Sequence, residues 1–360
     1  MKRWYGVGFA TLALWATIGC SQGDKAAETT GSTPSNTTGP SADSKPVKVG
    51  IVFDSGGRGD KSFNDSAWAG VERAKKEFSV EDSPVESKSE KDYEGNLTAL
   101  AEKGCDIVFA IGLNQKAALE KVAAQFPDIK FAIVDATPDP KAGLKNVRSL
   151  LFKEEEGSFL AGYLAGLMTK SNKIGFVGGM DIPLIHKFEA GYVAGAKTAN
   201  PAVEFLAPKY TGNWDDVGTA KAAANILFGG GADVVYHAAG RAGQGVISAA
   251  KEQGKFAIGV DSDQDYLEPG TVLTSMVKHV DEAVYSTIKD VKDGKFTPDE
   301  HIYDLKVKGV GLSPMTYTKD KIGPDNMKKV DDISAKVVSG EIKVPNDQTS
   351  LDAYLATLKK

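Results

Sequence analysis

Cysteine is scarce in this chain of 360 residues, which contains Cys20 and Cys105 and no other. Cys20 belongs to an N-terminal feature described below, so Cys105 has no partner for an intramolecular disulfide. Cys105 stands at the start of an apolar run, where a buried structural thiol is more common than a reactive one. The folded part of the chain must therefore be stabilised by a buried core, which a region of this length can form without disulfides.

Enzyme motifs are missing as well. Neither His-Glu-x-x-His nor Gly-x-Ser-x-Gly occurs. The glycines of residues 240–245 fall at the wrong intervals for the Gly-x-Gly-x-x-Gly dinucleotide fingerprint. The histidines are scattered, at His186, His237, His279 and His301. We therefore expect no catalytic residue, no metal site and no cofactor, and we predict that the protein is not an enzyme.

The chain also lacks an excess of positive charge. Its 43 Lys and Arg residues are outnumbered by 48 Asp and Glu, which gives a formal net charge of −5. The basic residues are spread through the sequence rather than gathered in blocks. This balance argues against nucleic acid or an anionic lipid surface as the partner.

The N-terminus has the pattern of a secretory signal. Two cations, Lys2 and Arg3, precede an apolar run over 4–18, which is too short to span a bilayer comfortably, and the run ends just before Cys20. We expect residues 1–19 to be a signal peptide, with Cys20 acylated as in a bacterial lipoprotein; the alternative is an ordinary signal peptide cut nearby. Residues 20–46 are of low complexity and predict a flexible tether. The protein is therefore expected on the outer side of a cell membrane, lipid-anchored.

From residue 47 onward, short apolar runs alternate with amphipathic stretches. The apolar runs are continuous, as in strands of a parallel sheet that is covered on both faces. Strands are expected at 47–53, 85–87, 107–111, 130–134, 147–152, 173–177, 203–206, 234–237, 256–260 and 272–277. Helices are expected at 62–78, 95–103, 115–125, 155–169, 185–199, 217–228, 244–252 and 280–291. The pattern predicts an α/β protein with two doubly wound lobes, and ligands of such sheets bind beyond the carboxyl ends of the strands.

The loop after the first strand, residues 54–68, carries the sharpest motif. It is not a phosphate loop, because Asp60 stands where glycine must precede Lys-Ser. Two interpretations of the residues that follow remain open. Asn64 or Asp65 could cap a helix, with Phe63 as a hydrophobic staple. Alternatively, Phe63 could stack on a ligand while Asn64 and Asp65 form hydrogen bonds to it. The tripeptide 58–60, Arg-Gly-Asp, also matches an integrin-binding motif.

An ordered series of motifs resembles the basic membrane protein (BMP) family of lipoproteins. The motifs are DKSFND at 60–65, AIG at 110–112, FAIVD at 131–135, EGSFLAG at 156–162, IGFVGG at 174–179, FEAGY at 188–192, GVDSDQ at 259–264 and SMVK at 275–278. The family comprises substrate-binding components of ABC transporters for purine nucleosides. The resemblance runs in register from about residue 47 to 311. It implies a type I periplasmic-binding-protein fold, in which two Rossmann-like lobes are joined by three hinge strands.

The resemblance also implies how the chain divides. We expect crossings between the lobes near Phe152, Met276 and His301. Lobe one would combine 47–152 with 277–300, and lobe two 153–275 with 302–320. Residues 321–360 would form a C-terminal segment to which we assign no function.

The ligand-binding residues implied by the resemblance come from both lobes. Phe63 and Phe188 would sandwich a purine base. The base edge would be contacted by Asn64, Asp65 and Asp135. The ribose hydroxyls would be held by Asp261 and Lys278, with close backbone approach at Gly240, since a carboxylate accepts two hydrogen bonds from a diol. Asp54 and Asn114, at strand ends, are weaker candidates.

The sequence therefore predicts a monomeric receptor that captures purine nucleosides such as guanosine, inosine or adenosine and delivers them to an ABC permease. Two alternatives stay open. The same fold could bind a sugar or another small polar metabolite. A surface adhesin could use the Arg-Gly-Asp tripeptide. The preferred nucleoside and the identity of the permease are not specified by the sequence.

Overall fold

The computed structural model describes residues 45–358, which lie within one compact unit, Asp43–Lys360. The expected signal peptide, Cys20 and nearly all of the tether fall outside the described residues. Within the described residues, no helix combines the length and the apolar character needed to cross a membrane.

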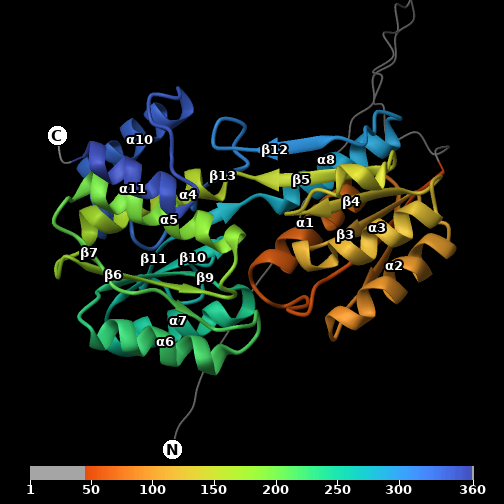
Figure 1. Ribbon diagram of the computed structural model, residues 1–360. Coiled ribbons are helices and arrows are strands. Elements are labelled where there is room, and N and C mark those ends of the chain that lie inside the picture. The colour runs from red at the N-terminus through yellow and green to blue at the C-terminus, as the bar shows by residue number, and fades with distance from the viewer. Residues whose placement is uncertain (1–44, 359–360) are drawn as a thin grey trace, which may run out of the picture. The chain divides into compact units, whose positions relative to one another are not determined.

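The first sheet has six strands in the order β12-β5-β4-β3-β1-β2, all parallel. They are β1 (Val47–Val52), β2 (Val80–Val85), β3 (Ile107–Ala110), β4 (Lys130–Val134), β5 (Val147–Phe152) and β12 (Glu300–Tyr303). Every residue of β3 is buried, because helices cover both faces of this sheet. Because these strands are parallel, the carboxyl ends of β1, β3 and β4 lie at one edge of the sheet; Figure 1 shows β3 and β4 side by side.

Two helix layers cover the first sheet, and alternate side chains of its strands face one layer or the other. Val49 and Ile51 pack with α1 (Phe63–Glu77) and α8 (Val280–Lys292). Val52 packs on the opposite face with α2 (Tyr93–Glu102) and α3 (Lys116–Gln125). Cys105 is buried in this second layer, as expected for a structural thiol.

The second sheet has the order β13-β11-β10-β9-β6-β7, with β8 paired to β6. Its strands are β6 (Lys173–Gly178), β7 (Glu204–Phe205), β8 (Lys209–Tyr210), β9 (Val234–Ala238), β10 (Phe256–Asp261), β11 (Val272–Lys278) and β13 (Val310–Leu312). Only β13 is antiparallel to its neighbour in this sheet. One face carries α4 (Glu154–Met168) and α5 (Pro183–Ala199), and the other carries α6 (Val217–Gly229) and α7 (Gln244–Gln253) (Figure 1).

Helices α4 and α5 touch backbone to backbone. A Cβ atom at Gly162 of α4 would lie 1.9 Å from the carbonyl oxygen of Tyr192 in α5. A Cβ atom at Gly195 of α5 would lie 1.9 Å from the carbonyl oxygen of Phe159 in α4. Only glycine fits at such a distance, so the two helices are locked together as one layer.

The chain passes between the sheets three times. It leaves the first sheet after Phe152 at the end of β5, returns after Lys278 at the end of β11, and leaves again after Tyr303 at the end of β12. The sequence placed these crossings near Phe152, Met276 and His301. Strand β11 thus lies in the second sheet through to its last residue.

The C-terminal segment adds a partial layer to the second lobe. It contains α9 (Lys319–Ile322), α10 (Pro324–Val338) and α11 (Gln348–Thr357). Helix α10 packs on α4, and α11 packs on α5. Tyr354 of α11 accounts for part of this contact, because its hydroxyl lies 2.9 Å from that of Thr198 and its ring meets Phe159 edge-on.

Candidate functional site

A cavity lies where the carboxyl ends of the two sheets face each other. It encloses about 650 Å³, part of it continuous with solvent. Its lining contains nine of the ten ligand-contact candidates from the sequence: Asp54, Phe63, Asn64, Asn114, Asp135, Phe188, Gly240, Asp261 and Lys278. Asp65 is not part of the lining. The remaining walls are formed by Gly56, Asp60, Gly112, Leu113, Leu184, Ile185, Trp214, Ala238, Arg241 and Val260.

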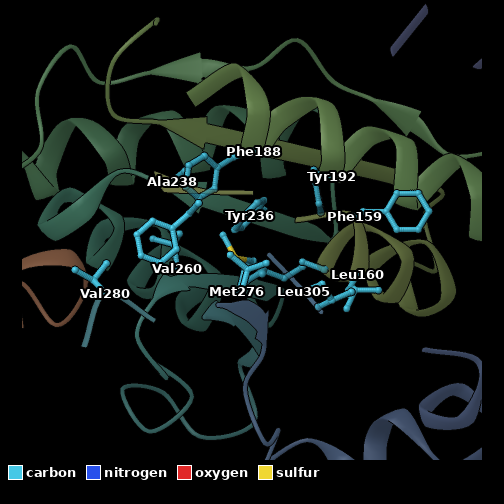
Figure 2. Close-up of a cluster of buried hydrophobic side chains, with 14 of the residues drawn as sticks. Phe159, Leu160, Phe188, Tyr192, Tyr236, Ala238, Val260, Met276, Val280 and Leu305 are labelled. Carbon is cyan, nitrogen blue, oxygen red and sulfur yellow. The ribbon is translucent and has the colours of Figure 1, made fainter. Parts of the chain in front are cut away.

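Two phenylalanines reach the cavity from opposite lobes. Phe63 is the first residue of α1, and Phe188 lies in α5 with 3% of its surface exposed. The ammonium nitrogen of Lys278 lies 5.3 Å from the ring centroid of Phe63 and 5.8 Å from that of Phe188. Figure 2 shows Phe188, Ala238 and Val260 together at one end of the buried cluster; all three line the cavity.

A buried charge cluster surrounds Lys278, the last residue of β11. Its Nζ lies 2.7 Å from both carboxylate oxygens of Asp135 and 3.1 Å from Oε1 of Glu154. All three side chains are at most 5% exposed. Burial alone would lower the pKa of the Lys278 ammonium, but the attraction of Asp135, Glu154 and Asp261 outweighs burial and raises it. The side chain of Lys278 is therefore protonated and positively charged.

Two aspartates in this cluster have an unusual backbone conformation. Asp135 directly follows β4 and Asp261 ends β10, and their φ angles are +66° and +63°. Aspartate adopts this left-handed conformation more readily than most residues, although the conformation still costs some conformational free energy. Residues strained in this way concentrate at functional sites. The two strands occupy matching positions in the two sheets: β4 is the fourth strand from the β2 edge, and β10 is the fourth strand from the β7 edge. The lobes thus place equivalent carboxylates around one lysine, which contacts Asp135 directly and attracts Asp261 at longer range.

Asp261 titrates far from its usual range. Burial raises the pKa of its carboxyl to about 7, aided by the negative charges of Asp60 and Asp135 and opposed by Lys278 and Ser62. The hydroxyl of Ser62 donates to Oδ2 of Asp261 at 2.5 Å. Since Ser62 is in lobe one and Asp261 in lobe two, this hydrogen bond joins the lobes.

The polar side of lobe one is built around Asn64. Its amide nitrogen donates to Oδ1 of Asp54 at 2.8 Å and to Oδ2 of Asp60 at 3.0 Å. Burial raises the pKa of Asp54 to about 6. Oδ2 of Asp54 faces Gly112, where a Cβ atom would lie 3.6 Å away. Asp54 therefore keeps one carboxylate oxygen toward the cavity.

The side chain that caps the start of α1 is that of Asp60, two residues before the N-cap position Ser62, and the two candidates from the sequence, Asn64 and Asp65, do not fill this role. The Asp60 carboxylate accepts the backbone N–H groups of Ser62, Asn64 and Asp65 at 2.9 to 3.1 Å. Asp65 instead accepts from the backbone N–H groups of Gly59 and Lys61, on the outer side of the loop. The sequence-based assignment of Asp65 to the cavity therefore disagrees with its position in the structure.

The buried position of Asp60 also corrects the adhesin hypothesis. Only 1% of Asp60 is exposed, and its carboxylate accepts three backbone hydrogen bonds at the start of α1. An integrin-type contact needs that carboxylate at the surface. The Arg-Gly-Asp tripeptide cannot present it while α1 is folded.

Two of the remaining predicted residues are positioned by their neighbours. Gly240 has φ +55°, and a Cβ atom there would lie 3.3 Å from the carbonyl oxygen of Trp214. The amide nitrogen of Asn114 donates to Glu90 at 2.8 Å, which leaves its amide oxygen free. Both residues line the cavity at loops that follow strands.

Sequence reasoning missed Trp214, Arg241 and Glu154. Trp214 lies against Gly179, where a Cβ atom would approach its ring within 2.3 Å. A large aromatic residue between Asn213 and two aspartates was a usable signal, because such a polar loop offers it no local core. Glu154 gave no signal, since it begins a run of glutamates typical of a helix's first turn. Within residues 45–358, no group of side chains has the makings of a metal site.

Comparisons of the sequence with a family model and with individual known proteins agree with one another. The family model described as "ABC transporter substrate-binding protein PnrA-like" matches residues 47–348. The "CD4+ T-cell-stimulating antigen" of Listeria monocytogenes is 38% identical over 324 residues, covering 84% of this chain and 89% of that protein. Basic membrane protein A of Borreliella burgdorferi is 36% identical, with 86% and 90% covered. The "ABC transporter nucleoside-binding protein BmpA" of Lactococcus lactis is 35% identical, with 83% and 89% covered.

Solved structures agree on the fold. A solute-binding protein of an ABC transporter system from Aeropyrum pernix aligns with a TM-score of 0.78 and 33% identity, over 87% of this chain and 98% of that one. A periplasmic solute-binding protein from Actinobacillus succinogenes aligns at 0.57 and 19% identity, over 77% and 100%, and shares the fold alone. The expected type I periplasmic-binding-protein fold is confirmed. The chain belongs to the Bmp family, the PnrA-like substrate-binding proteins of ABC transporters, which act outside the cytoplasm and are not a class of enzymes.

Proposed function

We propose that this protein captures purine nucleosides between its two lobes and delivers them to an ABC permease. The observation that carries the proposal is the pair of phenylalanines, Phe63 and Phe188, which reach one cavity from opposite lobes. A flat heterocycle between two such rings gains stacking energy from both. The name of the Lactococcus lactis relative, a nucleoside-binding protein, supports the same substrate class.

In this proposal the polar groups divide between base and sugar. Asp54 contacts the base edge from lobe one, and Asn64 orients that carboxylate by donating to its Oδ1. Asp135 and Lys278 form an ion pair with each other, and the lone pairs and N–H groups that this pair leaves free bind the ligand. Asp261 accepts hydrogen bonds from the ribose hydroxyls, and Gly240 lets the backbone approach closely. Asp65 takes no part, because it lies outside the cavity lining.

The charge of the cavity argues against nucleotides. Its lining includes the carboxylates Asp54, Asp60, Asp135 and Asp261. The two cations of the lining are already engaged: Lys278 is paired with Asp135 and Glu154, and Arg241 donates to the carbonyl oxygens of Gly56 and Arg58. A phosphate would therefore meet unpaired negative charge at close range, where repulsion is strong because the site is buried.

The cellular part of the proposal concerns Cys20 and the permease. We infer that Cys20 carries a lipid, that residues 20–46 tether the folded unit to the membrane, and that the protein acts as a monomer. Acylation is tested directly by metabolic labelling with a radioactive fatty acid, which a Cys20→Ser variant should fail to incorporate. Labelling of the variant equal to that of the wild type would overturn the anchor.

The test of the substrate is calorimetric titration of residues 43–360, the compact unit, after unfolding and refolding to strip any bound ligand. Guanosine, inosine, adenosine, cytidine, ribose and GMP are titrated separately. We expect one-to-one binding of purine nucleosides and weak or no binding of GMP. Binding of ribose in preference to the nucleosides would favour the sugar receptor instead, and no heat with any nucleoside would overturn the proposal.

The pH dependence of binding should report on Asp261. Since the pKa of Asp261 is about 7 in the unliganded protein, its carboxyl is mostly protonated at pH 6 and mostly ionised at pH 8. A ligand that donates to the carboxylate must displace that proton, so affinity should fall about tenfold from pH 8 to pH 6. Titration at both pH values checks this.

The control for this prediction is Asp261→Asn, which has no titratable group. The variant should bind more weakly at pH 8 and lose most of the dependence between pH 7 and 8. Asp54 has a pKa of about 6, so any remaining dependence should appear at lower pH. An unchanged slope in the variant would show that another group is responsible.

A further inference from the structure

We propose that residues 56–62, here called the strap, close over the cavity and are latched there by lobe two, and that this latch sets the rate at which a bound ligand leaves. The strap joins β1 to α1 and belongs to lobe one. The latch consists of four side chains of lobe two: Arg241, Gln244, Ser262 and Gln264. The kinetic part of this inference rests on the proposed nucleoside function, whereas the latch itself does not.

The latch contacts the strap through main-chain carbonyl groups. Arg241 donates from Nε and Nη2 to the carbonyl oxygen of Gly56, at 3.1 and 2.9 Å, and from Nη2 to that of Arg58 at 2.9 Å. Gln244 donates to the carbonyl oxygen of Asp60 at 3.1 Å. These donors stand at the start of α7 and in the turn before it.

The second half of the latch follows β10. Gln264 donates to the carbonyl oxygen of Lys61 at 2.9 Å, and Ser262 donates to that of Ser62 at 2.9 Å. Gln264 is fully buried, and its amide oxygen accepts from the backbone N–H of Val260 at 3.0 Å. The side-chain amide of Gln264 is therefore oriented by a contact within lobe two, independently of the strap.

The conformation of the strap turns its carbonyl groups toward lobe two. Residues Gly57, Gly59 and Lys61 have φ angles of +62°, +82° and +60°. Residues with positive φ thus alternate with residues of ordinary φ. The residues that precede Gly57, Gly59 and Lys61 contribute three of the five carbonyl groups that the latch contacts, at 56, 58 and 60. Glycine supplies this geometry without strain at two positions, whereas Lys61 adopts it at some cost.

The strap separates the cavity from the solvent. Gly56 and Asp60 line the cavity, and Gly57, Arg58 and Gly59 line a wide, open hollow on the other side. Gly56 and Arg241 border both spaces. Separation of the lobes would break all six hydrogen bonds of the latch at once, because every donor is in lobe two and every acceptor is in lobe one. A ligand could then leave past Arg241.

Lobe one holds the outer side of the strap independently of the latch. The guanidinium of Arg58 lies 2.6 Å from Glu86 and 4.9 Å from the ring centroid of Trp68. Trp214 of lobe two lies on the inner side, with its Cβ 3.8 Å from a Cβ atom built at Gly56. Of the four tryptophans in the chain, the other two precede Cys20. Tryptophan fluorescence of residues 43–360 therefore reports on the strap.

The kinetic experiment compares the wild type with Arg241→Ala and with the double variant Arg241→Ala/Gln244→Ala, all as residues 43–360. Dissociation of guanosine is followed by stopped-flow tryptophan fluorescence. We expect the dissociation rate to rise about tenfold in the single variant and further in the double variant, with the association rate changed less than threefold. Arg241→Lys, which keeps the charge but loses the forked donors, should fall between wild type and Arg241→Ala.

The control is Arg73→Ala, which removes an arginine whose ion pairs, to Glu77 and Glu282, lie on lobe-one helices α1 and α8. It should leave the dissociation rate unchanged. Urea unfolding should show that Arg241→Ala is folded and unfolds cooperatively, with a midpoint only slightly below that of the wild type, because the variant loses latch hydrogen bonds and no core packing. A dissociation rate for the double variant within twofold of the wild type would overturn the latch.

A ligand-free experiment separates this inference from the proposed function. Small-angle scattering gives the radius of gyration of the stripped wild type and of the double variant. We expect a larger radius in the variant, because the latch favours the closed arrangement without a ligand. If no nucleoside binds, the proposed function fails while the scattering result still decides the latch: equal radii would overturn it, and an expanded variant would support it.

Discussion

Lys278→Met should lower the free energy of unfolding by about 3–5 kcal/mol at pH 8, because it leaves buried carboxylates without their cation. Asp135 and Glu154 both contact the Lys278 ammonium, at 2.7 and 3.1 Å, and both side chains are almost completely buried. Methionine fills a similar volume without charge, so the loss of packing is small. Urea unfolding of the wild type and the variant measures the difference.

The pH dependence of this loss provides an internal check. A buried carboxylate without its cation has a higher pKa in the folded than in the unfolded state, so its cost is absent at low pH and grows as pH rises. The difference between Lys278→Met and the wild type should therefore shrink from pH 8 to pH 5. Adding Asp135→Asn to the variant should recover part of the loss at pH 8.

Lys289→Met is the matched control. Lys289 lies on α8 and pairs with Asp293 at 2.6 Å, but half of its side chain is exposed. Exposed pairs of this kind contribute about 0–1 kcal/mol, so this variant should unfold almost as the wild type does. A loss below 1 kcal/mol for Lys278→Met as well would mean that the buried cluster does not depend on its ammonium group.

Phe63→Ala should weaken guanosine binding about ten- to a hundredfold. Stacking on an aromatic side chain contributes about 1–3 kcal/mol per base, and each 1.4 kcal/mol is tenfold in affinity. Phe63 is only partly buried and begins α1, so its removal costs the fold less than a core substitution would. Calorimetric titration measures the affinity, and Phe63→Tyr, which keeps the ring, should retain most of it.

Phe78→Ala serves as the control for this prediction. Phe78 follows the other end of α1 and packs against Tyr285, with 6.1 Å between ring centroids. Its removal should reduce stability and leave the affinity for guanosine unchanged. If Phe63→Ala binds guanosine as tightly as the wild type, the base does not stack on this ring and the proposed sandwich is wrong.

The central strands were predictable from the sequence because their burial on both faces leaves a continuous apolar run. Strands β4 and β5 have the bounds that the sequence indicated. Of the four edge strands, β7 was expected, at 203–206, and the other three were not predictable in this way. Strand β2 has the sequence VEDSPV and only half-buried or exposed residues, so the sequence placed it too late, at 85–87. Strands β12 and β13 are also short and partly exposed, so no continuous apolar run marks them in the sequence.

The site was predictable where it depends on strand ends and less so where it depends on the meeting of the lobes. Asp135 and Asp261 could be expected at the sheet edges, because each follows an apolar strand. The sequence offered Asn64 or Asp65 as the cap of α1, and the role of Asp60 became visible only with the local backbone geometry. Trp214 could have been suspected from its polar surroundings in the sequence, but Arg241 is a functional candidate only because its loop faces the other lobe, and single-sequence patterns carry no information about that contact.

The glycine contacts between α4 and α5 limit how this protein can move. Helices separated by side chains can slide past each other in small steps, but carbonyl oxygens of one helix here occupy the space where Cβ atoms of the other would stand. Lobe two therefore has no internal plane of shear between these helices. Its rotation must be absorbed by φ and ψ changes at the three crossings, next to Phe152, Lys278 and Tyr303. The second of these is the residue whose ammonium binds carboxylates from both lobes, so the axis of rotation passes close to the ligand cavity.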